Sequence, residues 1–358
     1  MRREEPRQFY LPQLDGLRFV AFLAVFVFHF LQSARRPLSP TLIAVAEAGA
    51  FGVDLFFILS AFLITSLLLR EQASEGQIHV RAFWVRRALR IWPLYFLFVG
   101  VFLLLKRPPG WYALGLLTFT TNWALLHRWY PSPMNHLWSV AIEEQFYLCW
   151  PLILTLLGAR WLPVVSVAMI GGALVARASL LASRATLTDQ ALWIHTLDRL
   201  EPLALGILIA WLWSRTAPAW RLPAWPGVAS VGTSWALVAT IIRYYVAPGT
   251  LLGSPPIWTY TLVDVILAGS LGITLVAARG LLANPILVYL GKISYGLYVF
   301  HFPIIYGVRD GFGLLWPLRL LLTLGLTVAL AACSYRFLEQ PFLRLKQRFT
   351  YVRSAPFP

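Results

Sequence analysis

The sequence predicts an all-α fold: a polytopic transmembrane helix bundle of about ten spans, with both termini in the cytoplasm. Of the 358 residues, 59% are hydrophobic and 13% are charged, whereas soluble domains carry about 25% charged residues. Apolar runs long enough to cross a bilayer recur along the chain. Basic residues mostly flank those runs, as they do in membrane proteins whose topology they set.

The basic excess has its own explanation in a membrane protein. The net charge is +15, from 30 Lys and Arg against 15 Asp and Glu. In a soluble protein this balance would suggest a nucleic-acid partner. Here the basic positions suit topology signals and anionic lipid headgroups, so we expect membrane lipid as a partner and no nucleic acid. Cys149 and Cys333 lie within apolar runs, which indicates neither a disulfide framework nor a thiolate metal site.

The spans follow from the apolar runs in order. No early stretch ends in a small-residue cleavage site, so we expect the first run to be retained as a span. The segment 111–126 is apolar but rich in threonine, and it is ambiguous. Treating it as non-spanning gives an even count and leaves both basic ends in the cytoplasm, whereas counting it as a span would put the tail outside. The expected spans are 17–31, 51–69, 91–105, 136–157, 161–182, 201–213, 228–246, 257–278, 285–308 and 314–338.

No soluble domain or repeat array interrupts these runs. We therefore expect one integral membrane domain over residues 10–342, with short basic cytoplasmic tails at 1–9 and 343–358.

The first span carries two ionisable residues, Arg18 and His29, in an otherwise apolar run. Eleven residues separate them, so on a helix they lie on nearly one face, roughly 16 Å apart along the axis. Ionisable side chains at membrane depth mark a functional site by default. The alternative is that the arginine and the histidine each reach toward one membrane interface.

Arg86, Arg87 and Arg90 directly precede the third expected span. Arg87 and Arg90 project from neighbouring positions of a helix. Guanidinium groups arranged in this way suit phosphate, because each can donate two parallel hydrogen bonds. The alternative is a basic interfacial helix that anchors the protein to anionic lipid.

Glu143 and Glu144 lie well inside the apolar run 136–150. With ten spans, Glu143 falls in the outer half of the membrane, and so does His29. A histidine and a carboxylate at one depth suit general-base catalysis, with Glu143 orienting the His29 imidazole. The structural alternative is a buried charge pair between Glu143 and a nearby arginine.

Other polar or small residues point less clearly to chemistry. Asp54 and Ser60 are expected to be packing or cavity residues, and Gly49 and Gly52 permit close approach of another helix. His301, which ends a span, is expected to be structural.

Six runs then appear in an order that resembles the acyltransferase 3 family of membrane O-acyltransferases, over about residues 10–342. They are LDGLRFVAFLAVFVFHF, GVDLFFILSAFLI, FWVRRALRIWPLYF, WSVAIEEQFYL, GKISYGLYVFHFP and YRFLEQPF.

The resemblance implies an activity. Members of the family move an acyl group, often acetyl, from cytoplasmic acyl-CoA to a hydroxyl of a carbohydrate or another small molecule. The resemblance therefore implies acyl-CoA as a donor substrate, no tightly bound cofactor, and a multi-pass location in the cytoplasmic (inner) membrane. We also expect no metal, because the histidines form no close metal-ligand spacing. Some members carry a fused esterase-like domain, which we do not expect here.

The resemblance also implies site residues. The family's arginine-plus-histidine motif matches Arg18 and His29. Its paired-arginine motif, which is thought to hold CoA, matches Arg87 and Arg90, with Arg86 adjacent. Its glutamate matches Glu143. Ala61 and Trp92 stand where glycine and tyrosine are common.

The hypothesis that joins these residues has His29, held by Glu143, take the proton of the acceptor hydroxyl as that hydroxyl attacks the thioester. Arg18 would stabilise the CoA arm or the developing oxyanion. A covalent acyl group on His29 stays open as a second route.

Two rival functions, a transporter and a scaffold, would involve no catalysed reaction. A transporter of an acylated metabolite or glycan unit would use the intramembrane charges as a path, but its halves would show sequence symmetry, and we find none. A scaffold for an envelope-glycan complex fits poorly with the arginines that precede the third span.

Overall fold

The protein is a bundle of helices. The computed structural model describes residues 9–33, 39–183, 188–216, 221–245, 257–308 and 315–352, and no β-strand occurs among them. The α-helices are α1 (Pro12–Gln32), α2 (Pro40–Ala50), α3 (Gly52–Glu75), α4 (Val80–Lys106), α5 (Gly110–Leu117), α6 (Thr121–His127), α7 (Trp138–Leu157), α8 (Leu162–Ser183), α9 (Thr188–Ile194), α10 (Leu200–Thr216), α11 (Trp225–Tyr245), α12 (Trp258–Val276), α13 (Pro285–Lys292), α14 (Ser294–Val308), α15 (Trp316–Ser334) and α16 (Gln340–Lys346). Short helical turns are η1 (Asn135–Leu137), η2 (Ala159–Trp161), η3 (Leu197–Arg199), η4 (Leu281–Ala283), η5 (Tyr335–Glu339) and η6 (Gln347–Phe349).

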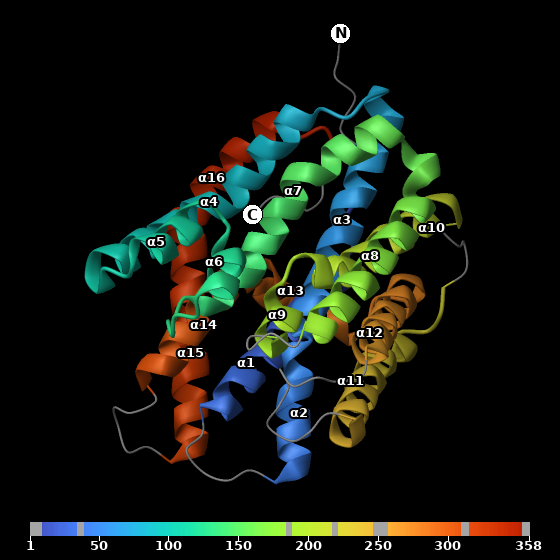
Figure 1. Cartoon of the computed structure of the whole chain (residues 1–358). Helices are drawn as coiled ribbons and strands as arrows, with labels where there is room; N and C mark the ends of the chain where they lie inside the picture. The colour runs from blue at the N-terminus through green and yellow to red at the C-terminus, as the bar shows by residue number, and fades with distance from the viewer. Residues whose placement is uncertain are drawn as a thin grey trace.

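Helix α3 is the centre of the bundle. It contacts α1, α7, α10 and α12, and in Figure 1 it runs through the middle of the molecule. The α2–α3 segment is 72% buried in its most apolar window, against 17% for the α8 segment and 22% for the segment that starts with α15. The outer helices therefore present most of their surface to the surroundings.

Eight helical segments in the described part of the chain are long and apolar enough to cross a membrane. They agree with a multi-pass membrane protein. Two further helices that match expected spans, α10 with 17 residues and α14 with 15, are shorter. The count of ten spans and the cytoplasmic placement of both ends remain predictions. Residues 1–8 and 353–358 of the expected tails lie outside the described residues.

The segment 111–126 forms two short helices, α5 with 8 residues and α6 with 7. Between them Phe119 has a positive φ of 55°, which interrupts the helix. A helix of this length extends about 12 Å, far short of the roughly 30 Å hydrocarbon core. Neither helix can span alone, which agrees with a non-spanning segment.

Two boundaries differ from the sequence-based expectation. The third expected span, 91–105, is the second part of α4, which begins at Val80, so Arg87 and Arg90 are part of the helix and Pro93 is interior. The expected span 285–308 is divided at Ile293, between α13 and α14. In both cases hydropathy marks the apolar part of a segment and does not report where the helix itself begins or breaks.

The predicted close approach at Gly49 and Gly52 is confirmed. A Cβ at Gly49 would lie 2.3 Å from the Ala24 carbonyl oxygen, and one at Gly52 would lie 2.4 Å from that of Ala21. Only glycine admits such backbone contact, and these two contacts fix α2 and the start of α3 against α1.

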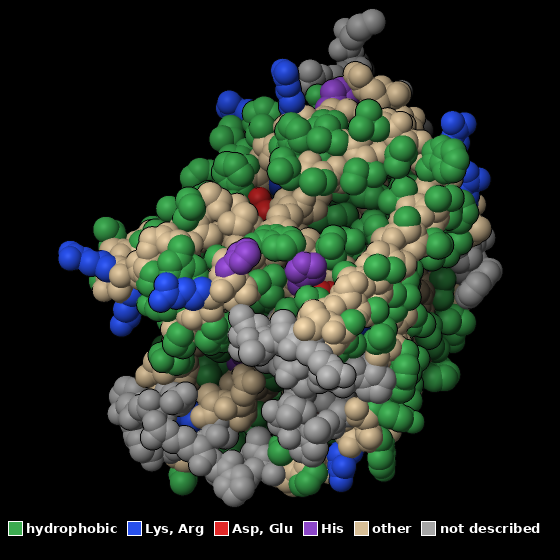
Figure 2. Space-filling model, in the orientation of Figure 1, with side chains coloured by type: hydrophobic (Ala, Val, Ile, Leu, Met, Phe, Trp, Pro, Cys, Tyr) green, Lys and Arg blue, Asp and Glu red, His purple; other side chains and the backbone are tan. Residues whose placement is uncertain are grey.

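The surface agrees with a lipid environment. Figure 2 shows hydrophobic side chains over much of the visible face, with Lys and Arg mostly near its margins. Leu104, Leu156 and Val167 are 79%, 82% and 68% exposed. A soluble monomer rarely exposes contiguous apolar area of this kind.

Candidate active site

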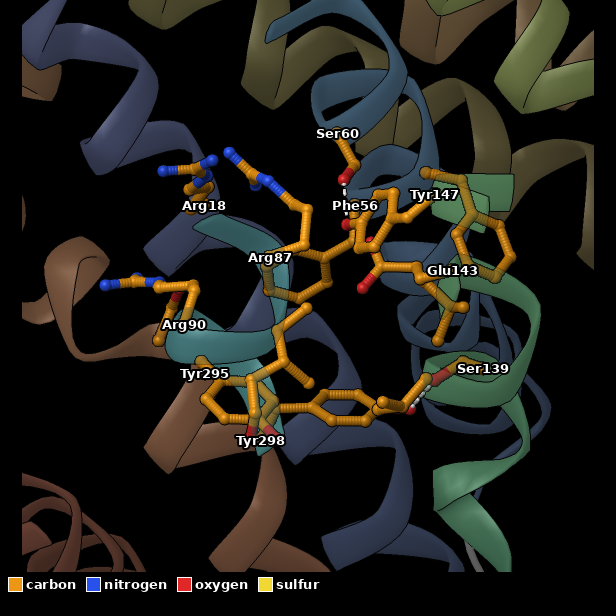
Figure 3. Close-up of a pocket in the computed structure, with 15 residues that line it drawn as sticks. Arg18, Phe56, Ser60, Arg87, Arg90, Ser139, Glu143, Tyr147, Tyr295 and Tyr298 are labelled. Atoms are coloured by element: carbon orange, nitrogen blue, oxygen red, sulfur yellow. Dashed lines mark hydrogen bonds between the residues drawn. The ribbon is translucent and has the colours of Figure 1, made fainter. Parts of the chain in front are cut away.

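A cavity of about 110 Å³ lies between α1, α3, α4, α7 and α14. Four predicted site residues line it together (Figure 3): Arg18, Arg87, Arg90 and Glu143. The full lining is Arg18, Val53, Phe56, Phe57, Ser60, Arg87, Arg90, Ile91, Ser139, Val140, Glu143, Tyr147, Ser294, Tyr295 and Tyr298. In Figure 3 the guanidinium groups gather on one side and Glu143 and Ser139 lie toward the other.

Arg18 is held from its own helix. Its Nη1 donates to the Asp15 carboxylate at 3.2 Å, one helical turn earlier, and the Tyr10 hydroxyl donates to the other oxygen of that carboxylate at 3.0 Å. Burial, and then the neighbouring Asp15 carboxylate, raises the pKa of Tyr10, so its hydroxyl stays a donor. A Cβ at Gly291 would lie 1.9 Å from the Asp15 carbonyl oxygen, so α13 packs tightly against this turn.

Arg87 and Arg90 reach the cavity from α4. The Arg87 guanidinium lies over the rings of Phe83 and Tyr147, with centroid distances of 5.6 and 5.8 Å. Its buried Nε has no hydrogen-bond partner among the described residues. Arg90 donates to the Lys292 carbonyl at 3.2 Å, at the end of α13, where helix carbonyls lack partners.

Arg86 lies elsewhere. It is not part of the cavity wall, and its Nη2 donates to the Glu71 carboxylate at 2.7 Å while its Nη1 donates to the Phe349 carbonyl at 2.7 Å. The side chain is therefore engaged in an ion pair that joins α3, α4 and the C-terminal segment. Adjacent helical residues point about 100° apart, which is why Arg86 and Arg87 face different surroundings.

Glu143 lies on the opposite wall from the arginines. Its carboxyl group lies beside Ser60 of α3 and Tyr147 of α7, whose hydroxyls hydrogen bond to each other. Glu144 faces a different direction and accepts a hydrogen bond from the Trp92 indole at 2.9 Å.

His29 does not pair with Glu143 in this structure. Its Nδ1 lies 3.0 Å from Nε2 of His301, and its ring packs at 4.6 Å from that of Phe302. The expectation that Glu143 orients His29 is corrected here. Glu143 lies on α7, seven residues after His136 of η1. It is His136 that approaches the other two histidines, with a ring distance of 5.2 Å to His301.

Tyr298 connects the cavity to the histidines. Its ring lines the cavity, its hydroxyl contacts Ser139 Oγ at 2.7 Å and donates to the His136 carbonyl at 2.9 Å, and its own carbonyl lies 2.6 Å from His301 Nδ1. His301 is one helical turn beyond Tyr298. Neither Tyr298 nor Ser139 is a predicted site residue, although both lie in the runs that carry the family resemblance.

Comparison with known proteins decides the family. The sequence model of a family described as an acyltransferase domain matches residues 11–336, most of the chain. The chain belongs to the acyltransferase 3 family. A Staphylococcus aureus (strain MRSA252) protein with a provisional O-acetyltransferase name is 28% identical over 98% of this chain and 60% of its own length.

A second relative of this acyltransferase 3 protein is the O-acetyltransferase OatA of Staphylococcus aureus (strain NCTC 8325 / PS 47), 30% identical over 93% of this chain and 57% of its own length. The chain thus spans about 60% of the curated relatives it matches. No solved structure matches it significantly.

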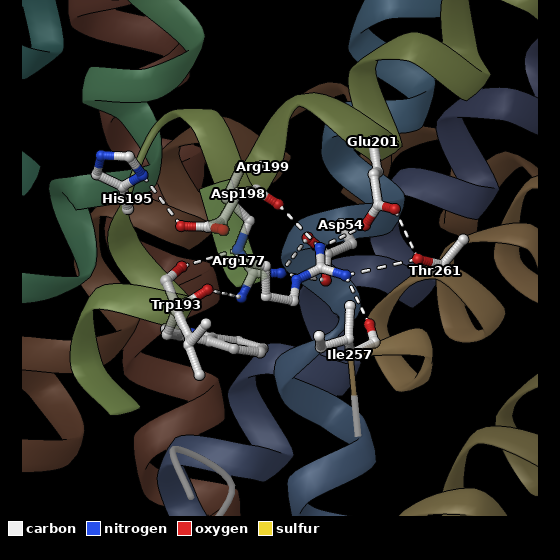
Figure 4. A network of polar contacts seen from close by, with 10 residues as sticks. Asp54, Arg177, Trp193, His195, Asp198, Arg199, Glu201, Ile257 and Thr261 are labelled. Carbon is white, nitrogen blue, oxygen red and sulfur yellow. Dashed lines mark hydrogen bonds and ion pairs between the residues drawn. The ribbon is translucent and has the colours of Figure 1, made fainter. Parts of the chain in front are cut away.

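A second polar cluster of the protein, formed by Asp54, Arg177, Arg199 and Glu201, lies outside the cavity lining. Figure 4 shows Arg199 against Asp54 and Arg177 against Glu201. The Arg199 Nη1 lies 3.0 and 3.1 Å from the two Asp54 oxygens, and Arg177 pairs with Glu201, which also accepts from Thr261 at 2.6 Å. Asp54, expected as a packing or cavity residue, is thus one partner of a buried ion pair that joins α3 to η3.

Among the described residues, no group of three or more His, Cys, Asp and Glu side chains has the arrangement of a metal site.

Proposed function

We propose that this acyltransferase 3 protein is a membrane O-acyltransferase that moves an acetyl group from acetyl-CoA to a hydroxyl of a glycan or small-molecule acceptor. The observation that carries the proposal is the convergence of Arg18, Arg87, Arg90 and Glu143 on one cavity from three different helices. The O-acetyltransferase names of the relatives support the same chemistry.

The arginine side of the cavity suits the donor. Three guanidinium groups face one lining carboxylate, so the wall is formally cationic and attracts phosphate. Arg87 adds an unpartnered buried Nε, a donor that a phosphate oxygen would satisfy. By the positive-inside rule this side faces the cytoplasm, where acyl-CoA is made.

The cavity volume suits the reactive end of the donor. A cavity of about 110 Å³ is below the usual range for whole drug-sized ligands. It admits the acetyl thioester, while the nucleotide stays at the arginine side. The Glu143, Ser60 and Tyr147 side chains then form the polar wall around that thioester.

His29 is the proposed base. It takes the proton of the acceptor hydroxyl, the hydroxyl oxygen forms a bond to the thioester carbonyl carbon, and the carbon–sulfur bond breaks. The proton then passes from His29 to the leaving thiolate, giving CoA and the acetyl ester. Arg18 stabilises the CoA arm or the oxyanion.

The test uses the purified full chain in nanodiscs with labelled acetyl-CoA, following CoA release and acetyl transfer to simple glycans. His29→Ala should lower turnover by about 100-fold or more, because general-base catalysis contributes that much. Exposed His127 provides the matched control, and His127→Ala should turn over like the wild type. Near-normal transfer by His29→Ala would exclude His29 as the base. If the wild-type protein did not turn over acetyl-CoA at all, the proposed acetyl-CoA-dependent activity would be wrong.

A further inference from the structure

Three histidines meet where α1, η1 and α14 pack together. His29 comes from α1, His136 from η1 and His301 from α14. The ring centroids of His301 lie 5.1 Å from His29 and 5.2 Å from His136. His301 is fully buried. From its sequence position His301 is expected to be structural, and it has no part in the proposed chemistry above.

The protonation of His301 follows from its two hydrogen bonds. Its Nδ1 lies 2.6 Å from the Tyr298 carbonyl oxygen, and a carbonyl oxygen can only accept, so Nδ1 carries a proton. The described groups around the ring are aromatic side chains, His29, His136 and that carbonyl. A cationic imidazole is costly in such surroundings. His301 is therefore neutral, and its Nε2 is an acceptor.

The tautomer of His29 follows in turn. His29 Nδ1 lies 3.0 Å from the His301 Nε2, and because that nitrogen accepts, His29 Nδ1 carries the proton. The Val25 carbonyl, one helical turn earlier, is a second acceptor beside the His29 ring. With Nδ1 protonated, the opposite nitrogen, Nε2, carries the lone pair. A base or a nucleophile needs this lone pair, so the hydrogen bond selects the reactive nitrogen.

We propose that His301 is a positioning residue for acyl transfer: it fixes His29 with Nδ1 protonated, so that Nε2 receives the proton of the acceptor hydroxyl. This rests on the proposed function, in which His29 is the base. When His29 becomes an imidazolium, its Nδ1–H donates more strongly to His301 Nε2, which stabilises the charge until Nε2 returns the proton to the thiolate. His301 gains and loses no proton.

The same contacts link the base to the donor cavity. Tyr298 lines that cavity and supplies the carbonyl that orients His301. One residue therefore sets both a cavity wall and, through His301, the orientation of His29. A purely structural His301 would contribute packing beside Phe22 but would leave the tautomer of His29 unaffected.

The test compares variants of the full chain in nanodiscs. In His301→Gln, the amide oxygen can accept from His29 Nδ1, whereas His301→Leu keeps the bulk and removes the acceptor. We expect His301→Leu to lower kcat by about 100-fold with little change in KM for acetyl-CoA, and His301→Gln to restore most of that loss. Exposed His127, which lies outside the histidine cluster, provides the control: His127→Gln should keep the pH profile.

A spectroscopic signature separates positioning from packing. In ¹⁵N-histidine spectra, with the His29 signals identified by their loss in His29→Asn, the wild type should show Nδ1 protonated and Nε2 bare. His301→Leu should lose that preference, and its pH–rate profile should shift. Should His301→Leu fail to fold, the wild-type tautomer and the His301→Gln profile still decide.

A wild-type His29 protonated at Nε2, or a His301→Leu variant with wild-type kcat, would overturn the inference. Retained transfer by His29→Ala would instead overturn the proposed base, so the two failures can be told apart.

Discussion

Two adjacent arginines differ in what their side chains contact. Arg86 is buried in an ion pair with Glu71, and Arg87 lines the cavity with an unpartnered Nε. Both follow from the rotation of about 100° between neighbours on α4. Of these two neighbours, Arg87 is therefore the one available to a phosphate group.

Arg87→Met should weaken binding of acetyl-CoA by about tenfold or more, because one charge-assisted hydrogen bond contributes roughly 1.5–3 kcal/mol. The measurement is a titration of the protein in nanodiscs with acetyl-CoA. The fold should be kept, since no ion pair is removed.

Arg86→Met is the matched control. Among the described residues it leaves the Glu71 carboxylate, 2% exposed, paired with His79 alone. Breaking a buried pair costs about 3 kcal/mol. We expect a lower unfolding temperature. A tenfold loss of acetyl-CoA affinity in Arg86→Met without loss of stability would contradict the assignment of a structural role to Arg86 and of donor binding to Arg87.

At the scale of elements, α10 packs directly on α3. A Cβ at Gly206 would lie 2.4 Å from the Ile58 carbonyl oxygen, and the buried pairs Arg199–Asp54 and Arg177–Glu201 tie the same region together. The contact fixes the rotation of α3, which carries Ser60 into the cavity.

Gly206→Val should destabilise the protein by about 2 kcal/mol, because a backbone carbonyl cannot yield to the added side chain. Thermal unfolding in detergent provides the measurement. Gly232 on α11 has open space around its Cβ position, so Gly232→Val should unfold at nearly the wild-type temperature. Equal effects of the two changes would rule out tight α3–α10 contact as the cause.

At the scale of the whole molecule, topology decides which side of the membrane receives the donor. The ten-span prediction requires that α5 and α6 together do not cross, so both ends of the segment 111–126 lie outside. Exposed cysteines at chosen loop positions can test this once Cys149 and Cys333, both exposed, are replaced by serine.

Pro109→Cys and Pro131→Cys should both react with a membrane-impermeant maleimide in intact cells, and Glu75→Cys only after permeabilisation. All three positions are exposed loop or helix-end residues. Labelling of Pro109→Cys and Pro131→Cys from opposite sides would mean that the segment spans, and the ten-span topology would be wrong.

Much of the site was accessible from residue patterns. The membrane class followed from composition, and the basic run of Arg86, Arg87 and Arg90 predicted a phosphate site, because guanidinium groups suit phosphate. The packing role of Gly49 and Gly52 could also be predicted, because only glycine fits where two helix backbones are in contact. The structural role of Arg86 could not be predicted, because its partners Glu71 and Phe349 come from other parts of the chain.

The sequence by itself determined the membrane class, the helical architecture and the family, because hydropathy, charge placement and local motifs are properties of short stretches. Tertiary structure alone decided that His29 meets His301 rather than Glu143. A hydrogen bond depends on the rotation and depth of both helices to within about an ångström, and residue spacing along each helix leaves those two quantities open.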